Sequence, residues 1–248
     1  MVKKYWNKIF TFIWKALLGF FVASIVSVIV FRFVPIPITP LMIQRLPEQA
    51  FGEGRKVRLK KDWEPIENIS KNLQLAVVCS EDQKFLDHFG FDVEAIKKAA
   101  ANNKKGKKIK GASTISQQTA KNVFLLPVRS YIRKGLEVYF TFLIELFWSK
   151  ERILEVYLNI IELGDGVYGA QAAAEYFFHK DASKLSSADA AMMAAVLPNP
   201  IKFKIDKPSK YMFKRQRWIM RQMSHWGGEL DFDKHSFDRE SEEEPDEE

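Results

Sequence analysis

The chain has 248 residues, of which 47% are hydrophobic and 28% are charged, and this fits one sizeable globular domain with appendages rather than two full domains. Its single cysteine, Cys79, excludes an intramolecular disulfide framework and lies in an apolar run, where a buried structural role is expected. The net charge of +7 hides two opposed parts: residues 1–228 hold 36 basic and 20 acidic residues, a net of +16, and residues 229–248 hold 11 acidic and 2 basic residues, a net of −9. A cationic body suits an anionic partner, such as phosphate groups, anionic lipid or nucleic acid.

The first apolar run is long enough to cross a bilayer. Residues 9–31 are free of charge apart from Lys15, and roughly 20 apolar residues span a membrane as a helix. A lysine near one end can extend its ammonium group to the lipid headgroups. Lysines precede the run within residues 1–8 and only Arg32 closely follows it, so the positive-inside rule places residues 1–8 in the cytoplasm and the rest of the chain outside.

A cleaved signal peptide is the main alternative for this run. Its apolar region would be shorter, and small residues would follow it at the cleavage site. Here the run is followed by Arg32-Phe33-Val34-Pro35 instead. The sequence therefore favours an uncleaved transmembrane signal anchor at residues 9–31.

A membrane-proximal linker or lobe is expected over residues 32–65. Its prolines at 35, 37 and 40 indicate a stiff, non-helical segment after the membrane, and residues 41–61 are interpreted as strand or irregular chain. A globular domain is expected over residues 66–228. The acidic residues 229–248 form a tail, which is expected to be disordered from Glu240 onward.

The globular part shows helical periodicity almost throughout, with apolar residues at i, i+3 and i+4. Ser149 and either Ser186 or Ser187 are expected to cap the helices that follow them. Helices are expected over residues 66–80, 95–101, 131–159 with a break at Ser149, 170–178, 188–197 and 211–226, and loops over 102–110 and 164–169. Because little strand signal follows residue 62, the predicted fold class is mainly α.

Two adjacent carboxylates, Glu81 and Asp82, follow the first helix of this domain. Ser80 and Gln83 fit a capping box, which explains those two residues but does not require the carboxylates. A partly desolvated carboxylate at the mouth of a cleft can serve as a general base. The pair is therefore a candidate catalytic site, and a plain helix terminus is the simpler interpretation.

The stretch from Gly111 to Asn122 is polar and lacks an apolar stripe. Thr114 and Gln117 fit a second capping box, which leaves other polar side chains without a structural explanation. These are Ser113, Ser116, Gln118 and Asn122. Hydroxyl and amide groups suit the hydroxyl and acetamido groups of sugars, and Lys121 suits a phosphate group as a point charge.

A cationic cluster of Arg129, Arg133 and Lys134 comes next along the chain. Arg133 and Glu137 stand at i and i+4, where an ordinary helix salt bridge would explain the pair. Arg129 and a second carboxylate in cationic surroundings favour a phosphate site instead. The four histidines show no ligand spacing, and no Gly-rich phosphate loop is present. We hypothesise that the carboxylate pair, the polar stretch and the cationic cluster form one catalytic cleft.

Five blocks of sequence stand out over roughly residues 66–200. They are Glu81-Asp82-x-x-Phe85-x-x-His88-x-Gly90, Gly111-x-Ser113-Thr114-Ile115-x-Gln117-Gln118-x-x-Lys121-Asn122, Arg133-Lys134-x-x-Glu137, Lys150-x-x-Ile153-Leu154-Glu155-x-Tyr157-Leu158-Asn159 and Ala194-Ala195-x-Leu197-Pro198-x-Pro200. Together these blocks resemble the monofunctional biosynthetic peptidoglycan glycosyltransferases, whose catalytic module also begins the bifunctional penicillin-binding proteins. The resemblance implies a lysozyme-like helical glycosyltransferase domain with a flexible lobe that faces the membrane.

The resemblance also implies a role for each matching position. Glu81 would be the general base, and Glu137 would be a second carboxylate that orients the cations or a bound metal ion. Lys121, Arg129, Arg133 and Lys134 would hold the phosphates of donor and acceptor. The substrate cleft would also be lined by Asp82, Phe85, Ser113, Gln117, Gln118 and Asn122, whereas residues 150–159 would be scaffold.

The implied reaction is the polymerisation of lipid II into β-1,4 glycan strands, with inversion and with release of undecaprenyl diphosphate. The resemblance places the protein in the bacterial inner membrane with its catalytic domain in the periplasm, with the bilayer and cell-wall synthesis or division proteins as further partners. No organic cofactor is implied, and a divalent ion, Mg or Mn, is left open at Glu137. This topology argues against nucleic acid as a partner, and no transpeptidase activity is expected because no such domain follows in the sequence.

Two other functions stay open at this point. A lysozyme-like muramidase or lytic transglycosylase would cleave glycan, but it would need two carboxylates across the scissile bond and would have little use for the cations. A membrane-tethered binding or scaffold protein would need no general base. Incubation with labelled lipid II separates the first alternative from synthesis, and substitution of Glu81 separates the second.

Overall fold

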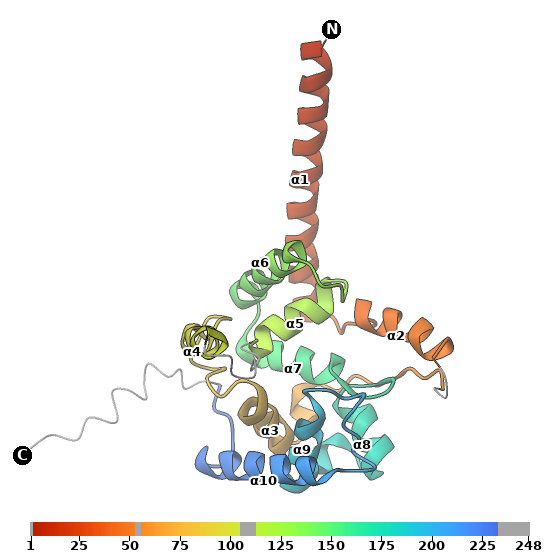
Figure 1. Cartoon of the computed structure of the whole chain (residues 1–248), viewed down its shortest axis with the longest axis vertical. Coiled ribbons are helices and arrows are strands. Elements are labelled where there is room, and N and C mark those ends of the chain that lie inside the picture. The colour runs from red at the N-terminus through yellow and green to blue at the C-terminus, as the bar shows by residue number, and fades with distance from the viewer. Residues whose placement is uncertain (1, 53–55, 105–112, 233–248) are drawn as a thin grey trace, which may run out of the picture. The chain divides into compact units, whose positions relative to one another are not determined.

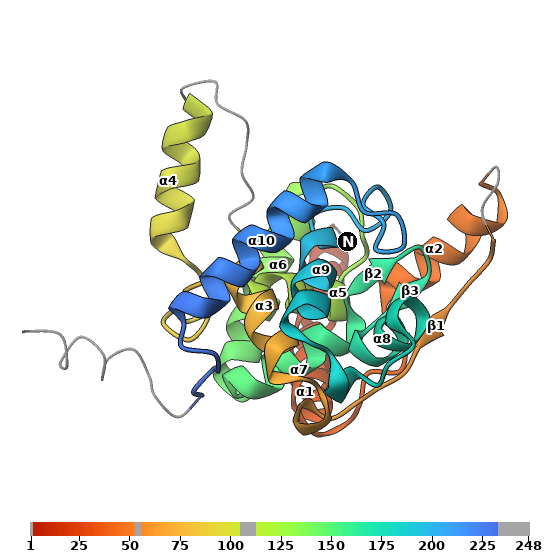
Figure 2. The ribbon, with the colours of Figure 1, turned by 90° about the horizontal axis from the view of Figure 1, so that it is seen from below.

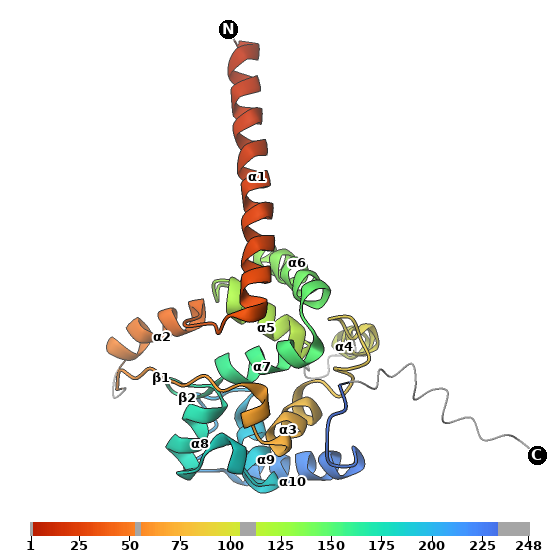
Figure 3. The ribbon, with the colours of Figure 1, turned by 180° about the vertical axis from the view of Figure 1, so that it is seen from behind.

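The computed structural model describes residues 2–52, 56–104 and 113–232. Residues up to Pro35 form one compact unit, and residues from Ile36 onward form another. The expected disorder from Glu240 onward lies outside the described residues, as does most of the expected basic loop over residues 102–110. Figure 1 shows the whole chain, and Figures 2 and 3 show it from below and from behind.

The first unit is almost entirely one helix, α1 (Val2–Phe33). Among the described residues, it is the one helix long and apolar enough to cross a membrane, over Tyr5–Phe33. Its apolar side chains, such as Phe10, Phe12 and Trp14, are exposed. The helix therefore fits a single-pass membrane anchor by length and composition.

The second unit begins with a helix, α2 (Pro40–Ala50), where strand or irregular chain was expected. Thr39 caps this helix by accepting a hydrogen bond from the Met42 N–H at 3.3 Å. Pro40 stands in the first turn, where its missing N–H costs nothing and its fixed φ favours the helix. The non-helical segment therefore ends before Pro40, and the interpretation of residues 41–61 as strand or irregular chain is wrong over α2.

A small three-stranded sheet lies beside the helices, with the order β1 (Lys60–Lys61), β3 (Val167–Tyr168), β2 (Glu162–Gly164). β1 runs parallel to β3, with Lys60 opposite Val167, and β2 runs antiparallel to β3. Between β2 and β3, Gly166 has φ +72°, and a Cβ there would lie 2.3 Å from the Arg58 carbonyl oxygen. The expected loop at residues 164–169 is thus the tight turn of a hairpin together with strand β3.

The remaining elements are helical. They are η1 (Ile66–Asn68), α3 (Lys71–Glu81), α4 (Val93–Lys104), α5 (Ile115–Phe124), α6 (Tyr131–Phe147), α7 (Lys150–Ile160), α8 (Ala170–Phe178), η2 (Ala182–Lys184), α9 (Ser187–Val196) and α10 (Lys210–His225). The periodicity of the sequence predicts most of them, whereas α5 is indicated only by its capping box and η2 is not predicted. Ser149 and Ser186 cap α7 and α9 through their side chains, as expected. The mainly α fold class is confirmed.

Helix α3 forms the centre of the core. Seven consecutive residues, Leu73 to Cys79, are buried, so the helix is covered on all sides. It packs against α9 and α10, and α5 packs against α6 and α7 (Figure 2). Burial raises the pKa of the Cys79 thiol to about 12, which fits the structural role expected for it. The well-packed α3 provides a rigid base for the carboxylates at its end.

Candidate active site

Glu81 is the last residue of α3, at the point where the helix leaves the core. Its side chain is 15% exposed. The Gln118 amide donates to Glu81 Oε2 at 3.0 Å, and the Ser80 hydroxyl donates to Oε1 at 3.3 Å. This carboxylate is therefore held in a defined position while it keeps access to solvent.

Asp82 lies below the surface and ties its own loop to α5. His88 Nε2 lies 2.9 and 3.1 Å from its two carboxylate oxygens, and the Ile115 N–H donates to Oδ2 at 2.9 Å. A carboxylate at a helix N-terminus is stabilised by the free N–H groups and the helix dipole. The structure thus places Asp82 as a link between the loop after α3 and the first turn of α5.

The N-terminus of α5 has the expected capping box, formed by Thr114 and Gln117. The Thr114 hydroxyl also donates to the Gly90 carbonyl oxygen at 2.7 Å. Gly90 has φ +76°, and a Cβ there would lie 2.8 Å from Thr141 Cγ2. A second hydrogen bond therefore joins the loop after α3 to α5, and the conformation of this loop requires glycine at position 90.

A buried ionic network supports this loop from beneath. Lys150 Nζ donates to Glu145 Oε1 at 2.8 Å and to the His88 carbonyl oxygen at 2.6 Å, and it lies 4.8 Å from the centroid of the Phe85 ring. The Ser116 hydroxyl donates to the same Glu145 oxygen at 2.5 Å. Residues from α5, α6 and α7 and from the loop after α3 thus meet at one charge pair.

The second carboxylate, Glu137, is buried in α6 between two cations. Arg133 Nη1 donates to Oε2 at 2.6 Å, and Lys134 Nζ donates to Oε1 at 2.5 Å. Ser130 caps α6 through the Arg133 N–H, and Arg129 is exposed just before the cap. The expected Arg133–Glu137 ion pair is present, and Lys134 makes it a group of three.

Lys121 connects the two carboxylates electrostatically. The pKa of its ammonium group lies below the ordinary lysine value, mainly because the group is buried. Arg133 and Lys134 lower this pKa as well, whereas Glu137 and Glu81 raise it. Within the described part of the chain, its side chain makes no hydrogen bond or ion pair. It is therefore a partly buried cation in the field of both Glu81 and Glu137, and its ammonium group can bind an anionic group of a ligand.

The structure divides the other expected cleft residues into two groups. Phe85, Gln117 and Asn122 are buried, and Gln117 is held by the capping box. Ser113 is exposed, and Gln118 is partly buried, with the Tyr157 hydroxyl donating to its side-chain oxygen at 3.3 Å. Of the polar stretch, Gln118 and Lys121 are therefore the residues placed beside the carboxylates.

One residue of the site, Arg215 on α10, was missed in the sequence. Its Nη2 donates to Ser80 Oγ at 3.0 Å and lies 3.7 Å from Glu81 Oε1. The signal that could have revealed it is its place on the inward face of α10, between the buried Met212 and Ile219. A charged residue on an apolar helix face usually has a buried partner.

Within the described residues, no group of three or more metal-ligating side chains lies together. Both oxygens of Glu137 accept hydrogen bonds from cations. A divalent ion prefers several oxygen ligands and no neighbouring cation, so the groups around Glu137 do not by themselves fit Mg or Mn.

Comparison with known proteins identifies the family. The model of a family described as Transglycosylase matches residues 48–224, which include all five sequence blocks. The chain belongs to the transglycosylase family. The expected family and the expected helical catalytic domain are thereby confirmed.

Several curated relatives of this transglycosylase share more than half of its aligned residues. A biosynthetic peptidoglycan transglycosylase of Pseudomonas putida is 58% identical over 214 residues, which are 86% of this chain and 90% of that protein. Proteins of the same name from Bacteroides thetaiotaomicron and Bdellovibrio bacteriovorus are 55% and 52% identical, over 88% of this chain and 88% and 87% of their own lengths. The likeness extends over nearly the whole length of these relatives.

Proposed function

We propose that this protein is a peptidoglycan glycosyltransferase that polymerises lipid II into β-1,4 glycan strands in cell-wall biosynthesis. The relatives named biosynthetic peptidoglycan transglycosylase support the reaction class. The observation that carries the finer proposal is that the partly buried Lys121 interacts electrostatically both with Glu81 and with the Arg133–Lys134–Glu137 group. Such a site offers a base at one end and a concentration of positive charge at the other.

Glu81 is the general base in this proposal. Its carboxylate takes the proton of the 4-hydroxyl of the acceptor N-acetylglucosamine, whose own pKa is far too high for ionisation near pH 7. The acceptor oxygen then attacks the anomeric carbon of the terminal sugar of the growing chain. The bond from that carbon to the diphosphate oxygen breaks, the configuration inverts, and undecaprenyl diphosphate leaves with the electron pair.

The cations stabilise the negative charge that develops on the leaving group. Lys121, Arg129, Arg133 and Lys134 hold the phosphates of donor and acceptor, and Glu137 fixes Arg133 and Lys134 in place. Because diphosphate is already a fair leaving group, fixed positive charge contributes more than a strong general acid would. The cluster therefore suits synthesis from a lipid diphosphate better than hydrolysis of a glycan.

The membrane completes the proposal, because both substrates carry lipid anchors. Helix α1 supports a single-pass anchor by its length and composition. The lysines that precede it in the sequence support the proposed orientation, with the N-terminus in the cytoplasm and the catalytic domain in the periplasm. Helix α6, which carries Glu137, also exposes apolar side chains: Tyr131 is 98% exposed, Ile132 is 78% exposed, and Phe142 and Leu146 are about half exposed. An apolar surface beside the proposed phosphate site suits contact with the bilayer in which those phosphates lie.

Incubation of the detergent-solubilised protein with labelled lipid II tests this function. We expect a polymer, and we expect Glu81→Gln to abolish it while the helical CD spectrum and lipid II binding stay largely intact. Parallel reactions with added divalent ion and with a chelator report on metal dependence. Shortening of preformed glycan without polymer, or full activity of Glu81→Gln, would contradict the proposal.

A further inference from the structure

Helix α10 and the loop before it carry an unusual excess of positive charge. Between Lys202 and Arg221 the sequence has eight basic residues and one acidic residue, Asp206. Arg215 is the one of these eight cations with an ion pair in the described part of the chain. The other seven are exposed: Lys202, Lys204, Lys207, Lys210, Lys214, Arg217 and Arg221.

Four of these cations form a stripe along α10, which we call the α10 cationic stripe: Lys210, Lys214, Arg217 and Arg221. Their spacing of four, three and four residues puts them on successive turns of one helix face. Like charges at such spacing destabilise a helix by about 0.2–0.5 kcal/mol per pair. No acidic residue of α10 offsets this cost, and Lys210 stands in the first turn, where the helix dipole disfavours a cation.

Packing does not account for the stripe. The buried residues of α10 are Met212, Ile219 and Met223, which face the protein body, whereas the four cations are exposed. Apolar side chains accompany the cations on the surface: Tyr211, Phe213, Trp218 and Met220 are exposed as well. A surface that combines cations with aromatic rings suits a ligand that combines anionic groups with sugar rings or apolar groups.

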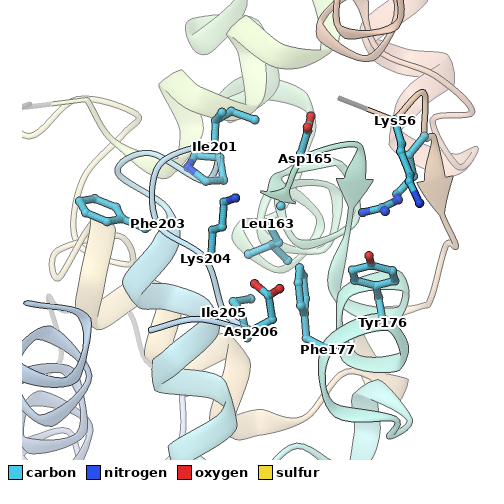
Figure 4. A pocket seen from close by; sticks show the side chains of 13 residues that line it. Lys56, Leu163, Asp165, Tyr176, Phe177, Ile201, Phe203, Lys204, Ile205 and Asp206 are labelled. Atoms are coloured by element: carbon cyan, nitrogen blue, oxygen red, sulfur yellow. The ribbon is translucent and has the colours of Figure 1, made fainter. Parts of the chain in front are cut away.

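The surface continues into a hollow of about 350 Å³ at the N-terminal end of α10. Figure 4 shows Phe203, Lys204 and Asp206 on one side of it and Tyr176 on the other. The Arg58 guanidinium lies 4.6 Å from the centroid of the Tyr176 ring. The hollow thus adds charged groups of both signs and an aromatic wall to the end of the stripe.

The position of α10 favours a polymer over a lipid surface as the ligand. Within the second unit, α10 lies at the opposite end from α6 (Figures 1 and 3). The exposed apolar residues of α6 are those proposed to contact the bilayer. The stripe therefore faces away from the proposed membrane surface, on the side where finished wall polymer would lie.

We propose that the α10 cationic stripe binds the peptide-bearing glycan of peptidoglycan, through the carboxylates of its peptides. This inference rests on the proposed function, because that function places the protein beside such a polymer. Each carboxylate contact is weak, but a polymer with a peptide on every repeat engages several cations at once, which raises the avidity. The contacts are exposed, so salt weakens them.

Sedimentation of the full-length, detergent-solubilised protein with insoluble peptidoglycan tests the inference. The variant Lys214→Glu/Arg217→Glu/Arg221→Glu reverses three charges of the stripe. The control Lys71→Glu/Lys97→Glu/Lys184→Glu reverses three exposed lysines elsewhere and changes the net charge equally. CD spectra confirm that both variants are folded.

We expect the stripe variant to bind peptidoglycan about tenfold or more weakly than the control variant, because several contacts of a multivalent interaction are lost together. Peptidoglycan stripped of its peptides should bind the unaltered protein as weakly as intact polymer binds the stripe variant. Equal binding by the two variants, or full binding of stripped glycan, would overturn the inference. The inference would also be overturned if the stripe variant lost binding to vesicles of anionic lipid but kept its binding to peptidoglycan, because that result would assign the stripe to a membrane.

Polymerisation of lipid II is measured on the same samples, which separates this inference from the proposed function. The stripe variant should polymerise lipid II at the rate of the control variant, since none of its substituted residues lies in the proposed catalytic cleft. Absence of polymer from all samples, with stripe-dependent binding to peptidoglycan, would remove the function and leave the binding site.

Discussion

Replacement of Lys150 by methionine should destabilise the protein strongly. The ammonium group of Lys150 holds Glu145 at 2.8 Å, and the two side chains are 14% and 3% exposed. Methionine fills a similar volume but cannot donate, so Glu145 would keep the Ser116 hydroxyl and lose its counter-charge. Loss of one partner of a buried ion pair costs about 3–5 kcal/mol. For a domain of 150–250 residues, this lowers the melting temperature by about 6–20 °C.

Thermal and urea unfolding of the detergent-solubilised protein measure this loss. The matched control is Lys180→Met, which breaks the 2.7 Å pair with Asp189, because Lys180 is 44% exposed and such surface pairs contribute at most about 1 kcal/mol. Adding Glu145→Gln to Lys150→Met removes the unpaired charge and should restore part of the stability. A loss no larger than that of Lys180→Met, or no recovery in the double variant, would refute the proposed role of the buried pair.

Three further substitutions test the site. Lys121→Met should lower kcat/KM for lipid II about 10²–10³-fold, as removal of a charge-stabilising donor does. Burial also lowers the folded-state pKa of Lys121, so the stability of the unaltered protein relative to this variant should rise with pH between that lowered pKa and the ordinary lysine pKa. Urea unfolding at several pH values measures this rise. Gly90→Ala should cost at least about 1–3 kcal/mol, because a non-glycine residue is strained at φ +76°, and a urea midpoint equal to that of the unaltered protein would contradict this strain. Thr114→Ala should cost about 1–2 kcal/mol by the same measurement, since it removes the cap of α5 and the bond to the Gly90 carbonyl oxygen; an unchanged midpoint would show that neither bond matters.

Local sequence signals predicted the helices well, because caps and periodicity are properties of neighbouring residues. Ser149, Ser186 and Thr114 each cap a helix as expected. The sheet could not be predicted in this way, since strands of two or three residues show no alternation, and β1 exists only through pairing with β3, more than 100 positions further along the chain. The capping box expected at Ser80 is absent for a similar reason, because α3 continues through Ser80 to Glu81.

The candidate site was only partly visible in the sequence. Glu81, Lys121 and Glu137 stand in sequence blocks that carry the family resemblance, and their catalytic roles stay predictions. Arg215 was missed because it reaches Ser80 and Glu81 from a helix more than 130 residues away. The burial of Asp82 and its bond to the Ile115 N–H likewise depend on tertiary structure, which no local pattern shows.

The carboxylate of Glu137 also acts as a built-in counter-ion. It accepts from Arg133 and Lys134 at 2.6 and 2.5 Å, so these three groups together carry one positive charge rather than two. A singly charged anion such as chloride or acetate should bind such a compensated cluster weakly. A diphosphate group carries more negative charge and can interact with Lys121 and with Arg133 and Lys134 at the same time. Selection by the number of charges on the anion would keep the proposed phosphate site free of small ions and available for the proposed lipid diphosphate.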